Sequence, residues 1–162
     1  VAEEVRFRIP SEGDLGCEVL ARHEPNVDAA ARARTRFQTG DACKLGEDLG
    51  TFDGALLSNL LCRLPEPLAC LDGLRAVLNP GGVAVIVTPF SWLEQWTPRR
   101  NWLGGFRDED TGAEVQSKER LAKEMTSRGF EKIHGEQMPV VIREHRRKYQ
   151  YIISEATAWR KL

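Results

Sequence analysis

The sequence predicts an α/β fold, and three observations lead to that prediction. Residues 83–87 form an uninterrupted run of small apolar side chains directly after a Pro-Gly-Gly turn. A strand wetted on one face alternates polar and apolar residues, so this run indicates a strand buried on both faces, as in a parallel sheet covered by helices. A second strand-like stretch covers residues 53–59, and leucines at helical spacing separate the two stretches. Strand, helix and strand at this spacing predict a parallel βαβ unit.

The bulk composition is that of one globular domain. The chain has 162 residues, of which 41% are hydrophobic and 29% are charged. Lys and Arg number 23 against 24 Asp and Glu, and this balance argues against a dedicated nucleic-acid binder. The sequence shows no apolar run of membrane-spanning length and no secretion signal, so we expect a cytoplasmic protein that does not bind membranes.

The cysteines show no metal-binding pattern. Cys17, Cys43, Cys62 and Cys70 form no C-x-x-C pair, and no histidine lies at zinc-ligand spacing from a cysteine pair. We therefore expect buried or half-buried free thiols and no metal site.

The first third of the chain has weaker patterns. Residues 5–9 alternate polar and apolar side chains, which predicts an edge strand that pairs with residues 17–21 across a turn. Residues 26–34 are rich in Ala and Arg and predict a short helix capped by Asn26. Residues 35–39 predict a further strand.

The middle of the chain is more regular. Pro65 and Pro67 mark a helix start, because proline is tolerated in the first turn. The apolar face of this helix is formed by Leu68, Leu71, Leu74 and Leu78. Residues 79–82 then end the helix and turn into the strand at 83–87.

The last third predicts a helix and a hairpin. Ser117 is a plausible N-cap, and Gly129 is a C-terminal stop. Residues 130–143 and 148–154 predict two strands around a charged turn, which makes an antiparallel pair at one edge of the sheet.

Polar side chains follow the predicted strands. Open α/β sheets bind ligands beyond the carboxyl ends of their strands. Asp41 can accept hydrogen bonds from an amine or a hydroxyl, Asn59 can donate and accept, and Leu60 can wall off a flat ring. The structural alternative is that Asp41 caps a turn and Asn59 ends a strand. Taken together, these residues favour a cofactor cleft.

The order of these features resembles a known fold. Gly40-Asp41-Ala42, then F-D-x-x-L-x-x-N from Phe52, a helix, N-P-G-G and a buried strand look like the second half of a class I S-adenosylmethionine-dependent methyltransferase. The resemblance implies a Rossmann-like sheet, mostly parallel, with an antiparallel C-terminal hairpin.

More specific segments narrow the resemblance. SNLLCRLPEP, TPFSWLEQWTP, WLGG and IREHRRKYQYIISEATAWRKL resemble the C-terminal methyltransferase domain of the ovothiol biosynthesis enzyme, a 4-mercaptohistidine N-methyltransferase family. In that family an iron-dependent sulfoxide synthase region of the same protein joins cysteine to histidine, and the C-terminal domain methylates an imidazole nitrogen of the resulting thiohistidine. The resemblance covers residues 36–162, and residues 1–35 are similar to a variable insertion, so we expect a single domain over 1–162.

One departure from the family is evident. Its Gly-rich loop after the first strand and its acidic residue after the second have no counterpart here, and Gly13-x-x-Gly16 follows no buried strand. The resemblance thus implies an N-terminally truncated fold. We expect this chain to bind S-adenosylmethionine weakly or not at all, and to self-associate through exposed sheet edges.

The resemblance also implies site residues. Asp41 would bind the adenine amine, with Ala42 packing on the ring, and Asn59 and Leu60 would lie near the methionine end of the cofactor. The acceptor pocket would contain Thr88, Phe90 and Trp92.

The acceptor's carboxylate calls for an arginine, and our candidates are Arg63 and Arg143; exposed surface positions are the alternative for both. Trp92, Trp96 and Trp102 either contact the sulfonium and substrate or pack a lid onto the sheet. No residue is assigned as catalytic base, because a neutral imidazole is already nucleophilic.

Two other functions remain open from the sequence. One is a class I methyltransferase that acts on another small molecule. The other is a non-catalytic methyltransferase-like remnant that serves as an interaction module, which the missing Gly-rich loop favours.

Overall fold

The computed structural model describes residues 4–24 and 26–162, which form two compact units. The smaller unit contains the described residues up to Thr39 together with Val141–Tyr151. The larger unit contains Gly40–Val140 and Ile152–Leu162. The expectation of a single domain over residues 1–162 stays a prediction, and each unit is described by itself.

The smaller unit contains a separate antiparallel hairpin. Its strands are β1 (Glu4–Glu12) and β2 (Leu15–Arg22), with Phe7 opposite Val19, which confirms the predicted pairing. Gly13 has a φ of 51° in the connecting turn and Gly16 lies within β2, so neither opens a helix, as the sequence indicated. This glycine pair therefore cannot form a phosphate-type or cofactor loop.

Two predictions for this unit are wrong in detail. The helix α1 spans only Ala29–Ala33, and its cap is Asp28, whose carboxylate accepts a hydrogen bond from the Ala31 N–H. Residues 35–39 form no strand. A strand requires backbone partners on a neighbouring strand, and the described part of the chain supplies none to this segment.

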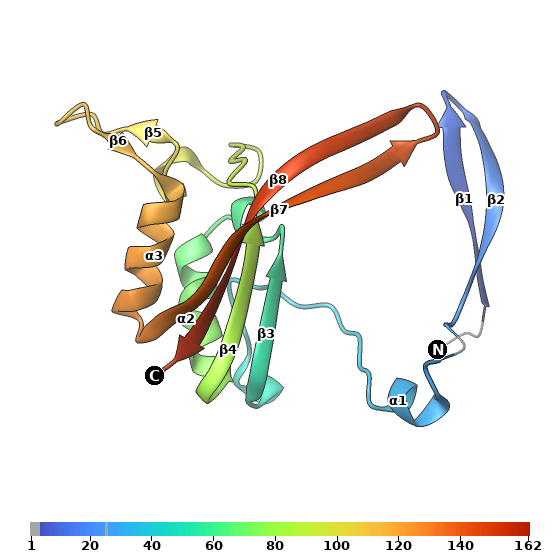
Figure 1. Cartoon of the computed structure of the whole chain (residues 1–162), viewed down its shortest axis with the longest axis horizontal. Coiled ribbons are helices and arrows are strands. Elements are labelled where there is room, and N and C mark those ends of the chain that lie inside the picture. The colour runs from blue at the N-terminus through green and yellow to red at the C-terminus, as the bar shows by residue number, and fades with distance from the viewer. Residues whose placement is uncertain (1–3, 25) are drawn as a thin grey trace. The chain divides into compact units, whose positions relative to one another are not determined.

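The larger unit is built on a four-stranded sheet of order β3-β4-β8-β7 (Figure 1). Its strands are β3 (Phe52–Ser58), β4 (Leu78–Thr88), β7 (Phe130–His145) and β8 (Lys148–Lys161). The parts of β7 and β8 within Val141–Tyr151 belong to the smaller unit. β3 and β4 are parallel, with Leu56 opposite Val85, and β4 and β8 are antiparallel.

The expectation of a mostly parallel sheet is therefore wrong: the fold is α/β with a mixed sheet. The reason is the tight turn between β7 and β8. It sends β8 back between β4 and β7, so that β8 runs antiparallel to both of its neighbours. The predicted C-terminal hairpin is confirmed, and β7 lies at the sheet edge.

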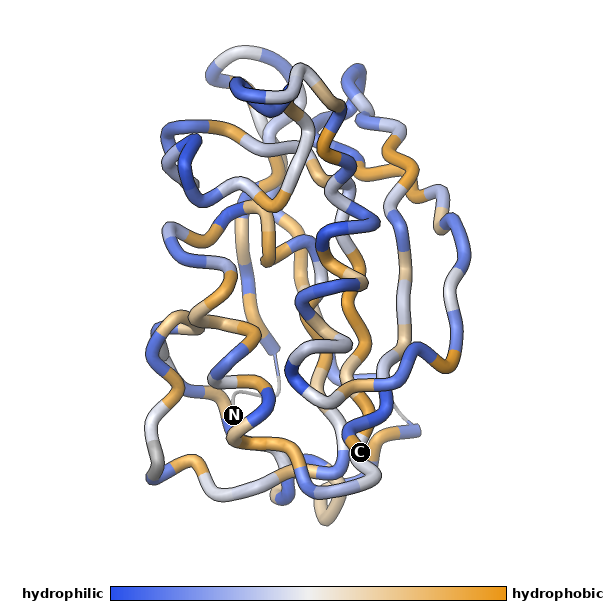
Figure 2. Tube along the Cα trace, turned by 90° about the vertical axis from the view of Figure 1, so that its left-hand side faces the viewer, coloured by the Kyte–Doolittle hydropathy of each residue, from blue (hydrophilic) through white to orange (hydrophobic). Residues whose placement is uncertain are grey.

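Two helices cover one face of this sheet (Figures 1 and 2). They are α2 (Pro67–Val77), which buries Leu71 and Leu74, and α3 (Ser117–Ser127), which buries Leu121 and Met125. Gln116, not Ser117, occupies the N-cap of α3. Gly129 follows α3 with a φ of 77°, a left-handed conformation that favours glycine, and this agrees with the predicted stop.

The remaining elements are short and lie mostly in loops: 3₁₀ turns at Glu47–Leu49, Leu61–Arg63 and Arg99–Asn101, and the strand pair β5 (Phe106–Arg107) and β6 (Glu114–Val115). Among the described residues, the helices are too short or too polar to cross a bilayer.

The strand at 83–87 is buried along one face and only partly along the other. Ala84 and Ile86 are fully buried beneath the helices. On the opposite face Val87 is also buried, whereas Val83 and Val85 are half-buried. Leu56, opposite Val85 on β3, is 67% exposed. An uninterrupted apolar run thus predicted the strand correctly, but its second face is only partly covered.

Candidate functional site

The carboxyl ends of the two parallel strands lie side by side. Asn59 directly follows β3, and its N–H donates a hydrogen bond of 2.8 Å to the Val87 carbonyl near the end of β4. The parallel register, which pairs Ser58 with Val87, produces this contact. The expectation that the strand ends share one edge of the sheet is therefore correct for these two strands. It is wrong for Asp41, because residues 35–39 form no strand.

Both strand ends adopt an unusual backbone conformation. Asn59 and Phe90 have φ values of 51°, and they are the non-glycine residues with positive φ in the described chain. Asparagine tolerates this region, whereas a bulky residue such as phenylalanine occupies it at a cost of about 1–3 kcal/mol. The Phe90 N–H donates to the buried Thr88 hydroxyl at 3.2 Å, which helps to hold the turn. Such strain concentrates at functional sites, and here it appears after both strands.

A third strand supplies a polar group that the sequence analysis missed. Ser154 of β8 is 1% exposed, and its hydroxyl donates to the Asn59 side-chain oxygen at 3.3 Å. This contact leaves the Asn59 amide nitrogen available as a donor, because no bond to it occurs within the described residues. A polar residue inside the apolar stretch of a predicted strand was the available signal. Asn59, Thr88, Phe90 and Ser154 are called the strand-end cluster below.

Asp41 performs the turn-capping role that was its structural alternative. One carboxylate oxygen accepts a 2.9 Å hydrogen bond from the Cys43 N–H, and the Asp41 carbonyl accepts one from the Lys44 N–H. The side chain is exposed, and its second carboxylate oxygen remains free of hydrogen bonds within the described chain. Asp41 can therefore cap its turn and still bind a ligand amine.

An apolar cavity of about 310 Å³ lies between β3 and α2, next to this turn. Ala42 and Leu60, both expected to contact the cofactor, line it, and its other lining residues are Leu45, Leu49, Phe52, Gly54, Ala55, Leu56, Leu57, Cys70, Leu74 and Val77. Burial raises the pKa of the Cys70 thiol to about 12, with smaller contributions from Cys43 and Asp41, so this thiol stays neutral. A wall of this chemistry suits a flat, weakly polar ring such as adenine.

The proposed acceptor residues are held by specific contacts. Arg63 donates to the Ser91 carbonyl and, at 3.2 Å, to the Ser91 hydroxyl, so it ties the segment after β3 to the loop after β4. Trp92 is 7% exposed, and its indole N–H donates to the Ser117 hydroxyl at 2.9 Å. Trp92 thus packs into the core in this structure. Arg143 belongs to the smaller unit, and substrate binding by all three residues stays a prediction.

Comparison with known proteins identifies similar sequences and folds. Residues 14–135 match the family model described as a methyltransferase domain. No curated protein matches the chain.

Three solved structures illustrate the likeness in fold. The first is an S-adenosylmethionine-dependent methyltransferase from Methanosarcina mazei, with 20% identity and a TM-score of 0.52 over 84% of this chain and 79% of that one. The second comes from work on the conversion of a disulfide bond into a thioacetal group during echinomycin biosynthesis. It has 17% identity and a TM-score of 0.53 over 82% of this chain and 59% of that one. The third is the [4+2]-cyclase SpnF, with 16% identity and a TM-score of 0.53 over 82% of this chain and 58% of that one. At such identities the likeness concerns the fold alone, and the cyclase illustrates how widely chemistry varies on one fold.

Proposed function

This chain belongs to the methyltransferase-domain family, and on that premise we propose that it is an enzyme that transfers a methyl group from S-adenosylmethionine to an imidazole nitrogen of a thiohistidine. The observation that carries the proposal is the meeting of the β3 and β4 ends, where Asn59 bonds to Val87. Ligands in open α/β sheets bind beyond such ends. The choice of thiohistidine as acceptor rests on the four sequence segments that resemble the ovothiol biosynthesis enzyme.

The chain's residues fit the adenine end of the donor. Ala42 and Leu60 line the apolar cavity and would pack against the ring. The free oxygen of the Asp41 carboxylate would accept a hydrogen bond from the exocyclic amine. Bound S-adenosylmethionine supplies an electrophilic methyl carbon on a sulfonium.

The strand-end cluster would hold the imidazole ring of the acceptor. Methyl transfer requires the attacking nitrogen to lie in line with the methyl carbon and water to be excluded. Asn59 can donate its side-chain amide to a ligand while Ser154 fixes the orientation of that amide. A neutral imidazole needs no base before attack, and the product proton can leave to water.

The substrate implies a partner reaction. A thiohistidine arises when a sulfur atom is joined to the imidazole ring. We therefore propose that an iron-dependent sulfoxide synthase region of the same protein supplies the acceptor.

The proposal is tested by mass spectrometry of a reaction that contains the chain, S-adenosylmethionine and thiohistidine. We expect methylthiohistidine to form, and histidine to react more slowly because its ring lacks the sulfur. The affinity for S-adenosylhomocysteine is measured in parallel by NMR titration, which detects weak binding. We expect a dissociation constant above the micromolar range.

Two variants of one residue separate binding from folding. Asp41→Ala removes both the turn cap and the proposed adenine partner, whereas Asp41→Asn keeps an oxygen for the Cys43 N–H and replaces the carboxylate charge. Both should weaken cofactor binding roughly tenfold, the value of one charged hydrogen bond. Unchanged binding in Asp41→Asn would show that Asp41 only caps its turn. A wild-type chain that neither binds the cofactor nor forms product would favour an interaction module.

A further inference from the structure

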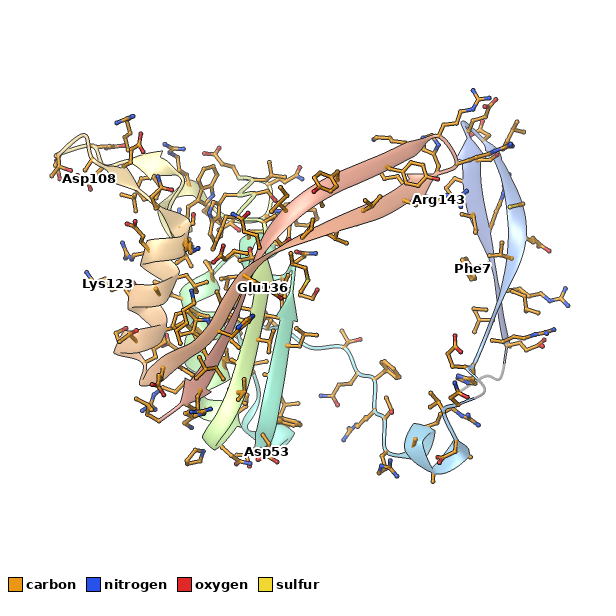
Figure 3. The ribbon with its side chains drawn as sticks, in the orientation of Figure 1. Phe7, Asp53, Asp108, Lys123, Glu136 and Arg143 are labelled. Atoms are coloured by element: carbon orange, nitrogen blue, oxygen red, sulfur yellow. The ribbon has the colours of Figure 1, made fainter. Side chains whose placement is uncertain are left out.

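A cleft of about 430 Å³ lies between the 3₁₀ turn Arg99–Asn101 and the β5–β6 hairpin. Three guanidinium groups and three carboxylates line it, together with the ring of Phe106; the charged residues are Arg99, Arg100, Arg107, Asp108, Glu109 and Asp110. Figure 3 shows Asp108 on this hairpin. We call this set of residues the arginine cleft.

The Arg99 guanidinium is held in place by aromatic rings. Its central carbon lies 5.3 Å from the centre of the Trp102 ring and 6.0 Å from that of Phe106. Trp102 in turn stacks on Trp92 at 6.4 Å and donates its indole N–H to the Thr97 carbonyl. A guanidinium fixed in this way loses little conformational entropy when it binds an anion.

The segment that carries both arginines is anchored at its two ends. The buried Thr97 hydroxyl donates to the Leu64 carbonyl at 2.7 Å. The Asn101 amide donates to the Pro65 carbonyl at 2.8 Å. These bonds attach the segment to the residues between β3 and α2, so the cleft has a rigid side.

Some charged groups of the cleft already have an ion-pair or hydrogen-bond partner, and others have none among the described residues. Arg107 pairs with Glu114, and Asp108 accepts bonds from both the N–H and the hydroxyl of Thr111, which lower the pKa of its carboxyl. In contrast, Arg99 and Arg100 form no ion pair with any described residue. The same holds for Glu109 and Asp110.

Building on the methyltransferase function argued above, we propose that the arginine cleft recognises an amino-acid acceptor as a zwitterion. Arg99 and Arg100 bind its carboxylate, and Glu109 and Asp110 attract its ammonium group. Arg63, the earlier candidate, already donates to Ser91. A site for a phosphate or a nucleic acid would not place carboxylates on the same rim, because they repel polyanions.

The proposal is tested by calorimetric titration of the full chain with thiohistidine and with its decarboxylated amine. We expect the amine to bind the wild-type chain about tenfold more weakly or worse, because it lacks the charge-assisted hydrogen bonds. Arg99→Ala and Arg100→Ala should each weaken thiohistidine binding by about the same factor and leave binding of the amine nearly unchanged.

Three controls make the outcome specific. Arg99→Lys keeps the charge but loses the planar fork, so it should bind thiohistidine more weakly than wild type. Arg146→Ala removes an exposed arginine of the other unit and should change nothing. Thermal unfolding followed by circular dichroism should give the wild-type midpoint for every variant, which shows that the variants are folded.

The outcomes distinguish this inference from the function on which it rests. Equal affinities for thiohistidine and the amine, or unchanged binding in both alanine variants, would overturn the arginine cleft alone. A wild-type chain that binds no thiohistidine at all would overturn both proposals.

Discussion

Single residues at the site show how far a side chain can be assigned before the fold is known. Asn59 follows a recognisable strand and was expected at the site. Ser154 was not: its place in an apolar strand was a signal, but which site it contacts depends on the neighbouring strand. The cysteines show the same limit: all were expected to be at least half-buried, but Cys17 is exposed, while Cys62 and Cys70 are buried.

Burial of the thiols predicts their order of reactivity. With iodoacetamide near pH 8 we expect Cys17 to react fastest and Cys43 more slowly. Cys70 should react only on unfolding, because it is inaccessible and burial raises its pKa to about 12. Peptide mass spectrometry over time measures these rates. Alkylation of Cys70 as fast as that of Cys17 in the folded chain would contradict the buried placement.

At the scale of elements, an ion-pair network joins the two helices. Arg128, just after α3, pairs with Asp72 of α2 at 2.7 Å and with Glu124 of α3 at 2.6 Å, and Arg120 pairs with Glu124 at 2.8 Å. Hydrogen bonds from Arg128 and then Arg120 lower the pKa of Glu124 below its usual 4.5. The sequence predicted both helices from their apolar faces but not this link, because Asp72 and Arg128 are far apart in the chain.

The lowered pKa sets the pH dependence of this link. A carboxyl with a lowered folded-state pKa stabilises the fold above its unfolded pKa, and that contribution is lost as the pH falls through the folded value. Glu124→Gln should therefore destabilise the chain by about 1 kcal/mol at pH 7 and by progressively less below pH ~4. Thermal unfolding followed by circular dichroism, at pH 7 and below pH ~4, measures the loss of stability in the variant relative to wild type. Glu119→Gln, a change at an exposed position of the same helix, is the control, and an equal loss in both variants would argue against the network.

At the scale of the larger unit, the sheet leaves apolar surface uncovered. β3 is an edge strand among the described residues. Leu56 on β3, which also lines the apolar cavity, is 67% exposed beside the half-buried Val85. Unpaired edges and apolar faces promote association. We propose that a second copy of the chain covers this surface.

A charge on the exposed face should prevent that association. Analytical ultracentrifugation over a range of concentrations should show wild-type dimers or larger species, and Leu56→Lys should shift the chain toward monomer. Leu93→Lys replaces another exposed leucine, 45% accessible and located in a loop, and should leave association unchanged. A wild-type chain that stays monomeric at every concentration would refute the proposal.

The sequence by itself determined most of the local elements. Apolar runs and helical spacing depend on neighbouring residues alone, so β3, α2, β4, α3 and the final hairpin could all be predicted, as could Asn59 at a strand end. Only the tertiary structure decided that β8 returns between β4 and β7, that one face of β4 stays half-covered, and that Arg99 stacks on Trp102. These features depend on contacts between segments distant in sequence, and a local pattern of side chains carries no information about which distant backbone or ring will be its neighbour.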